Sequence, residues 1–114
     1  MMRYYHNPRC SKSRQGLSML HERGIEPDVV AYLDHPPSVD ELRVLIGKLG
    51  IPARALLRTG EDAYVELGLA DNGLDDAALI AAMVSHPKLI ERPIFEHGKR
   101  AVIGRPPERV LEIL

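Results

Sequence analysis

The apolar and polar positions at the start of the chain predict a strand, a helix and a second strand. "MRYYH", residues 2–6, is short and aromatic-rich, as strands often are, and the Asn7-Pro8 step after it marks a turn. Helical spacing follows, with Leu17 and Leu20 on one face. "PDVVAYL", residues 27–33, predicts the second strand. Strand, helix and strand in this order imply a parallel pair with a right-handed crossover.

The strongest helical pattern lies in "SVDELRVLIGKLG", residues 38–50. Ser38 followed by Glu41 is a capping box, which satisfies the free N–H groups at a helix start. Gly50 stands where such a helix would end. The apolar stripe follows the i, i+3, i+4, i+7 spacing and comprises Leu42, Leu45, Ile46 and Leu49.

The rest of the chain predicts short helices, a hairpin and a closing helix. "ARALL" and "AYVEL" suggest two short helices within residues 52–69, and Asp75 is placed to cap a helix over residues 76–85. "RPIFEHGKRAVIG" predicts a β-hairpin with Gly98 at its turn. "RPPERVLEIL" begins with prolines, which suit the first turn of a helix. This last helix is expected to bury Val110, Leu111 and Leu114.

These elements predict an α/β fold with a mixed four-stranded sheet. Helices flank the sheet, and the helical middle of the chain is an insertion between its parallel and antiparallel parts. The layout is that of thioredoxin-like folds. No repeat or linker divides the sequence, so we expect a single domain over residues 1–114.

Composition and charge restrict the classes of function. Hydrophobic residues make up 45% and charged residues 27%, which suits a soluble protein with a buried core. Fifteen basic and sixteen acidic residues leave a formal charge of −1, which disfavours a nucleic-acid or membrane-surface partner. The longest apolar run, residues 77–84, is too short to span a bilayer, and we expect no signal peptide. The single cysteine allows no internal disulfide, so a reducing cytoplasm is the expected location.

Cys10 stands at the predicted start of the first helix, in "YYHNPRCSKSR". Helix N-termini stabilise negative charge and so lower the pKa of a thiol, and their free N–H groups also bind anions. Arg14 lies one helical turn further on, and His6, Arg9 and Lys12 would add positive charge. A lone cysteine is more often a small buried hydrophobe, but the polar and basic flanks here favour a reactive thiolate.

The spacing around Cys10 excludes two familiar thiol sites. "CSKS" is a C-x-x-S sequence, so Ser13 stands where a dithiol site has its second cysteine, and an external thiol must resolve any adduct. Only three residues separate Cys10 from Arg14, whereas the phosphate loop of tyrosine phosphatases has five. No Cys/His cluster has the spacing of zinc ligands, so we expect no metal.

Three further arginines are candidates for oxyanion binding. Planar guanidinium groups match tetrahedral oxyanions, although most arginines are simply exposed. The candidates are Arg58, Arg92 and Arg105, and the last two each precede a proline. In thioredoxin-like folds the proline at the position of Pro93 is usually cis and faces the active-site cysteine, which would bring Arg92 close to Cys10.

The sequence resembles the ArsC family, the glutaredoxin-coupled arsenate reductases with a thioredoxin-like fold. The resemblance covers nearly the whole chain and rests on segments that occur in the family's order: "YHNPRCSKSR", "YLDHPPSVDEL", "RALLR", "ELGLAD", "HPKLIERPI" and "GRPPERVLEIL". It implies that a cysteine attacks arsenate, that glutathione then attacks the adduct and arsenite is released, and that glutaredoxin recycles the enzyme. Glutathione would be an external reductant, no cofactor would be tightly bound, and a monomer is expected.

The resemblance also implies a role for each matching residue. Cys10 corresponds to the nucleophile, and His6 to a histidine thought to influence the thiolate. Ser13 and Arg14 match the Ser-Arg pair of the family, in which the serine hydroxyl can hydrogen-bond the thiolate. The family's three oxyanion-binding arginines match Arg58, Arg92 and Arg105.

The chain departs from well-characterised arsenate reductases at Ser11-Lys12, where those proteins tend to read Gly-Thr. "HNPRCSKSR" is closer to a branch named arsenate-reductase-like, whose substrate is not established. Alternatives to arsenate reduction are therefore a monothiol redox protein or an enzyme acting on another substrate. A third is a regulator that binds RNA polymerase, as the related Spx proteins do, although those usually carry C-x-x-C.

Overall fold

In the computed structural model, which describes all residues 1–114, the chain divides into two compact units. The first comprises Met1–His35 and Arg92–Leu114, and the second comprises Pro36–Glu91. The predicted single domain over residues 1–114 stays a prediction. The second unit is inserted in the sequence between β2 and β3, so the predicted helical insertion is present.

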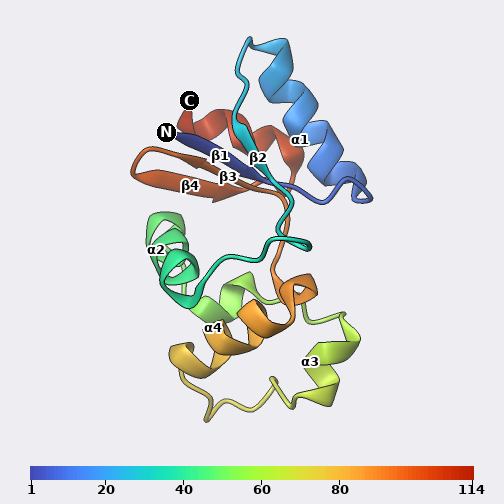
Figure 1. Ribbon diagram of the computed structural model, residues 1–114, viewed down its shortest axis with the longest axis vertical. Coiled ribbons are helices and arrows are strands. Elements are labelled where there is room, and N and C mark those ends of the chain that lie inside the picture. The colour runs from blue at the N-terminus through green and yellow to red at the C-terminus, as the bar shows by residue number, and fades with distance from the viewer. The chain divides into compact units, whose positions relative to one another are not determined.

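The first unit contains the mixed four-stranded sheet that the sequence predicts (Figure 1). Its spatial order is β2-β1-β3-β4, with β1 parallel to β2, and with β3 antiparallel to both β1 and β4. The strands are β1 (Met2–Tyr5), β2 (Asp28–Val30), β3 (Ile94–His97) and β4 (Arg100–Ile103). Strand β2 is shorter than predicted because the backbone turns after Val30, where Tyr32 N–H donates back to the Val30 carbonyl at 3.0 Å.

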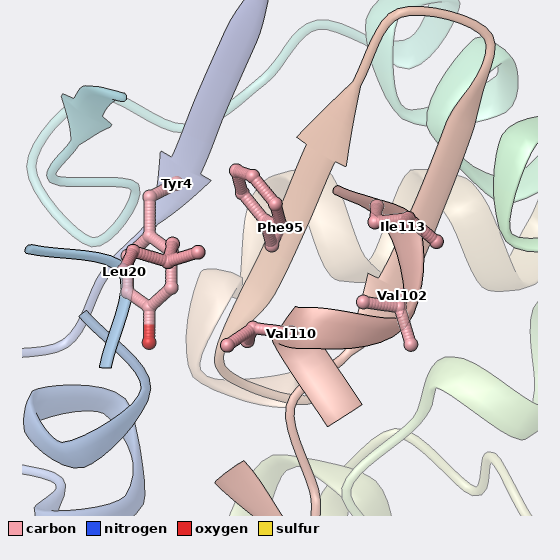
Figure 2. Packing of buried hydrophobic residues seen from close by; sticks show 6 residues of the cluster. All are labelled: Tyr4, Leu20, Phe95, Val102, Val110 and Ile113. Atoms are coloured by element: carbon pink, nitrogen blue, oxygen red, sulfur yellow. The ribbon is translucent and has the colours of Figure 1, made fainter. Parts of the chain in front are cut away.

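A row of side chains on one face of this sheet forms the core of the first unit (Figure 2). Tyr4, Phe95 and Val102 are register partners on β1, β3 and β4 and therefore point to the same side. Helix α1 (Ser11–Glu22) and the 3₁₀ helix η3 (Pro107–Ile113) pack against each other and cover this row. They contribute Leu20, Val110 and Ile113 to the cluster.

The closing segment corrects one prediction. It is a 3₁₀ helix with three residues per turn, so its buried positions recur every three residues. These positions are Pro107, Val110 and Ile113, whereas Leu111 is partly buried and Leu114 is 42% exposed. Val110 was predicted correctly, and Leu114 was predicted wrongly from an α-helical spacing.

The second unit is helical, as its apolar pattern predicts. Its elements are η1 (Ala53–Leu56), η2 (Pro87–Leu89), α2 (Val39–Leu49), α3 (Asp62–Glu66) and α4 (Asp76–Ser85). The predicted capping box at Ser38 and Glu41 is present, and Gly50 ends α2 with φ of 67°. The carboxylate of Asp75 accepts from Ala78 N–H at 2.9 Å and caps α4, as expected. Helix α4 packs against α2, η1 and η2.

Candidate active site

Cys10 occupies the N-cap position of α1, directly after the loop that follows β1. Its carbonyl accepts the first helical hydrogen bond, from Arg14 N–H at 3.1 Å, and its own N–H donates to the Asn7 carbonyl at 3.0 Å. The Cys10 side chain is partly exposed. The thiol therefore sits at the free N–H end of a twelve-residue helix and remains reachable from solvent.

The surroundings of Cys10 favour the thiolate. Burial by itself raises the pKa of the thiol, but the backbone N–H groups of Ser13 and Lys12 and the guanidinium of Arg92 lower it by a larger amount. Arg92 acts both through a hydrogen bond and through its charge. The net pKa of Cys10 lies below the ordinary thiol value, as expected for a cysteine at a helix N-terminus.

Two of the three predicted arginines lie at the thiol. Arg105 Nη2 is 3.7 Å from Cys10 Sγ, and Arg105 Nε donates to the carbonyl of Arg92 at 2.8 Å. Both arginines precede cis prolines, Pro93 and Pro106, so the expected cis bond before Pro93 is present. Gly104 N–H donates to the Pro93 carbonyl at 2.9 Å and ties the two arginine-bearing segments together.

Arg58, the third predicted arginine, lies in the second unit and has carboxylates as neighbours. Arg58 Nη1 is 2.5 Å from Glu91 Oε1, and Arg58 Nε is 3.9 Å from Glu61 Oε2. Arg58 thus forms ion pairs with two side chains that the sequence analysis did not single out.

Ser13 organises the loop beneath the thiol. It is fully buried, and its hydroxyl accepts from Asn7 N–H at 3.0 Å and lies 2.7 Å from His6 Nδ1. Its carbonyl accepts from the Tyr4 hydroxyl at 2.6 Å. These contacts connect β1, the loop and α1, while a hydrogen bond from the Ser13 hydroxyl to the thiolate stays a prediction.

His6 is a neutral partner of Ser13 and not an added cation. Burial lowers the pKa of the imidazole, and the nearby Arg14 guanidinium lowers it further. A neutral ring that carries its proton on Nε2 can accept a hydrogen bond from the Ser13 hydroxyl at Nδ1. The same hydroxyl oxygen accepts a hydrogen bond from the backbone N–H of Asn7. The positive charge beside Cys10 therefore comes from arginine.

The Arg14 side chain stabilises the loop with a hydrogen bond. Its Nη1 donates to the Pro8 carbonyl at 2.7 Å, two residues before Cys10. The loop is also held by the Asn7 side chain, whose Oδ1 accepts from Arg9 N–H at 3.0 Å in an Asx-turn arrangement. The sequence predicts a turn at the Asn7-Pro8 step, and the structure adds the side-chain hydrogen bond of Asn7 that holds this turn.

A cavity of about 300 Å³ opens beside this loop. Residues 6–9 line one side, and Ala31, Leu33 and Asp34, which follow β2, line the other. No group of three or more His, Cys, Asp or Glu side chains is arranged to hold a metal ion. No helix has the length and apolar character that a membrane span would require.

Comparisons with known proteins bear on the family and the fold of this chain. The sequence model of the ArsC family matches residues 5–113. A protein of Escherichia coli K12 named "Uncharacterized protein YfgD" is 55% identical over 114 residues, which cover 99% of this chain and 96% of that protein. An arsenate reductase of Neisseria meningitidis serogroup A is 48% identical over 114 residues, which cover 99% of this chain and 97% of that protein.

The fold is shared with a solved arsenate reductase from Vibrio cholerae, with a TM-score of 0.97 and 54% sequence identity. That match covers 99% of this chain and 97% of the other, and it confirms the predicted thioredoxin-like α/β class. The resemblance found in the sequence is also confirmed, because the family model spans nearly every residue. The chain belongs to the ArsC family.

Proposed function

We propose that this protein is a thiol-dependent arsenate reductase in which Cys10 is the nucleophile. The observation that carries the proposal is the thiol at the start of α1, with its pKa lowered and Arg105 Nη2 3.7 Å from its sulfur. A thiolate needs this kind of electropositive, accessible setting to attack. Relatives at about half identity are named arsenate reductases, which supports arsenate as the substrate.

Arg92 and Arg105 serve this reaction as the oxyanion-binding groups. Their guanidinium groups present several N–H donors to the region around the sulfur, where the oxygens of a tetrahedral anion would lie. The free N–H groups at the start of α1 add donors at the same place. Donors that are already in position stabilise the charge that develops on the oxyanion during attack. We assign Arg58 to substrate binding as well, from its match to the family's third arginine.

The proposed chemistry has two thiol steps. Cys10 Sγ attacks arsenic and forms an S–As bond, and an oxygen of arsenate leaves as water after protonation. Glutathione sulfur then attacks Cys10 Sγ, the S–As electron pair stays on arsenic, and arsenite is released. Arsenic gains two electrons, and the two sulfurs lose them in forming a mixed disulfide between Cys10 and glutathione.

An external thiol is required because the site has one cysteine. Ser13 is buried and replaces the resolving cysteine of a dithiol site, so the mixed disulfide must pass to glutaredoxin. Cys10 is partly exposed, so an external thiol can reach its sulfur from solvent. His6, Ser13 and Arg14 act as positioning residues, since their hydrogen bonds fix the loop and the first turn that carry Cys10.

The test is arsenite production from arsenate with glutathione and glutaredoxin. We expect wild-type turnover that is lost in Cys10→Ser, because serine is not ionised at neutral pH and cannot be oxidised to a disulfide. Reactions lacking glutathione should stop at the first adduct, and reactions lacking only glutaredoxin should stop at the mixed disulfide after one turnover; both are matched controls. Wild-type activity no greater than that of Cys10→Ser would contradict the proposal.

The second candidate is a monothiol redox protein without an oxyanion substrate. The partly exposed thiol with a lowered pKa and no second cysteine favours it, because such thiols form mixed disulfides readily. Mass spectrometry after incubation with oxidised glutathione tests this function. A glutathione adduct on Cys10 without arsenate turnover would select it over the first candidate, and the absence of any adduct would reject it.

A further inference from the structure

Tyr4 places a hydroxyl group against the first turns of α1 from inside the core of the first unit. The side chain is fully buried, and its hydroxyl donates to the backbone carbonyl of Ser13 at 2.6 Å. Strand β1, which carries Tyr4, is paired with β2 on one side and with β3 on the other. The ring also lies against Phe95, with 6.4 Å between the ring centroids (Figure 2). The sheet therefore fixes the position of the hydroxyl, and α1 packs onto it.

Gly16 provides the space that this hydroxyl occupies. A Cβ atom at position 16 would lie 2.5 Å from the Tyr4 hydroxyl oxygen, too close for any stable contact. The same Cβ would lie 3.6 Å from the ring carbon that bears the hydroxyl and 3.4 Å from Val110 Cγ1, which are ordinary contact distances. A glycine inside a helix is less stable than an alanine, because it loses more backbone freedom on folding. The hydroxyl, and not the ring, therefore requires the glycine at this position.

Ser13, the residue that the hydroxyl contacts, also directs a backbone N–H group to the Cys10 sulfur. Burial raises the pKa of Cys10, and the Ser13 N–H lowers it more than any other group does. The Ser13 hydroxyl accepts from Asn7 N–H at 3.0 Å, so this residue is held both at its side chain and at its carbonyl. The strength of a hydrogen bond falls steeply as its angle departs from linear. The stabilisation of the thiolate therefore depends on how firmly Ser13 is oriented.

We propose that Tyr4 is a positioning residue for the Cys10 thiolate and that it acts through the backbone of Ser13. The Tyr4 hydroxyl, in the space that Gly16 leaves, holds the carbonyl of Ser13 so that the N–H group of the same residue stays directed at the sulfur. The inference rests on the proposed role of Cys10 as the nucleophile. Burial raises the pKa of Tyr4, so its hydroxyl keeps its proton and remains a donor over the pH range in which the thiol ionises.

The test follows the ionisation of Cys10 through its rate of alkylation by iodoacetamide as a function of pH. The chain has one cysteine, so modification of a thiol reports on this residue alone. In Tyr4→Phe we expect the midpoint of the profile to rise by about half a pH unit, because the Ser13 N–H is less firmly directed at the sulfur. The matched control is Tyr64→Phe, which removes a hydroxyl from α3 in the second unit and should leave the midpoint unchanged.

Two further variants separate the hydroxyl from the rest of the Tyr4 side chain. Gly16→Ala places a methyl group against the hydroxyl, so it should displace the hydroxyl, raise the midpoint as Tyr4→Phe does and lower the Tm. In Tyr4→Phe/Gly16→Ala the methyl group meets the ring and Val110 at ordinary distances. We therefore expect the double variant to keep the midpoint of Tyr4→Phe and to have a Tm at least as high.

Thermal unfolding verifies that each variant is folded, and Gly16→Ala carries the test if Tyr4→Phe does not fold. A lower Tm with an unchanged midpoint in the folded variants would overturn the proposal and leave Tyr4 as a core residue only. A shift in Tyr64→Phe as large as that in Tyr4→Phe would also overturn it, because the effect would then not depend on the contact with Ser13.

This measurement uses no arsenate and is independent of turnover. If the midpoint shifts as expected but the wild type forms no arsenite, the inference about Tyr4 stands and the proposed reductase function fails. If the wild type forms arsenite and the midpoint does not shift, the function stands and the inference fails.

Discussion

The two compact units use arginine in opposite ways. In the sheet unit, Arg92 and Arg105 are directed to the Cys10 sulfur, where positive charge stabilises a thiolate. In the helical unit, Arg58 forms an ion pair with Glu91 and a longer one with Glu61. The same residue type therefore lies beside a nucleophile in one unit and forms ion pairs with carboxylates in the other. The surrounding residues, and not the arginine itself, decide its electrostatic effect.

The largest effect that would sharpen this comparison is expected at Arg105. Replacing it with alanine removes a charged donor beside the sulfur, so kcat for arsenate reduction should fall by about 10²- to 10³-fold. Steady-state kinetics measure the change. The matched control is Arg100→Ala, an exposed arginine at the start of β4, which should leave kcat nearly unchanged. Equal losses in both variants would mean that Arg105 has no special relation to the thiol.

The two units also differ in how closely side chains pack around a glycine, and here we expect effects of intermediate size on the free energy of unfolding. A Cβ at Gly104, beside the site in the sheet unit, would lie 2.8 Å from Pro93 Cγ and 3.1 Å from Val110 Cγ1. Gly104→Ala should therefore lower the free energy of unfolding by about 1–3 kcal/mol through overpacking. Gly47 lies within α2 of the helical unit with no atom within 4 Å of such a Cβ, so Gly47→Ala should raise it by about 0.5–1 kcal/mol.

Urea unfolding of both glycine variants measures these changes. The Gly47 variant is the control for the general effect of adding a methyl group, since alanine also restricts the unfolded chain. The packing contrast between the two glycines would be refuted if Gly104→Ala were as stable as the wild type.

The smallest effect concerns the thiol itself. Arg92 lowers the pKa of Cys10, so Arg92→Gln should raise it and reduce the thiolate fraction at any pH below the midpoint. The alkylation rate of Cys10 by iodoacetamide at neutral pH should fall several-fold, and the midpoint of its pH profile should move to higher pH. The matched control is Arg109→Gln, an exposed arginine paired with Glu112, which should not move the midpoint. A midpoint unchanged by Arg92→Gln would remove Arg92 from the electrostatics of the thiol.

Local sequence signals account for most of the secondary structure. The capping box at Ser38, the Asp75 cap and the glycine after α2 were predictable because each acts within a few residues of its own position. The mixed sheet followed from the order of the elements. The burial of Leu114 was predicted wrongly because the sequence does not distinguish a 3₁₀ from an α-helical spacing in a short apolar segment.

The reactive residue of the site could be predicted from the sequence, but the long-range side-chain contacts could not. Cys10 at a helix start, with Ser13 in place of a second cysteine, could be read from the sequence alone. The turn at Asn7-Pro8 could also be read from the sequence, because it is local. The pairing of Glu91 with Arg58 could not, because that contact spans 33 positions of the chain.

The sequence by itself determined where most elements begin, where the single thiol lies and that no second cysteine stands beside it. These properties depend on short-range periodicity, caps and residue type. The tertiary structure alone decided which arginine serves the thiol and which pairs with carboxylates. Arg105 lies 95 positions from Cys10 and reaches it only through the sheet and the chain that follows β4. The charge state of His6 was likewise decided by burial and by Arg14, because pKa values depend on solvent exposure and on neighbouring charges in space.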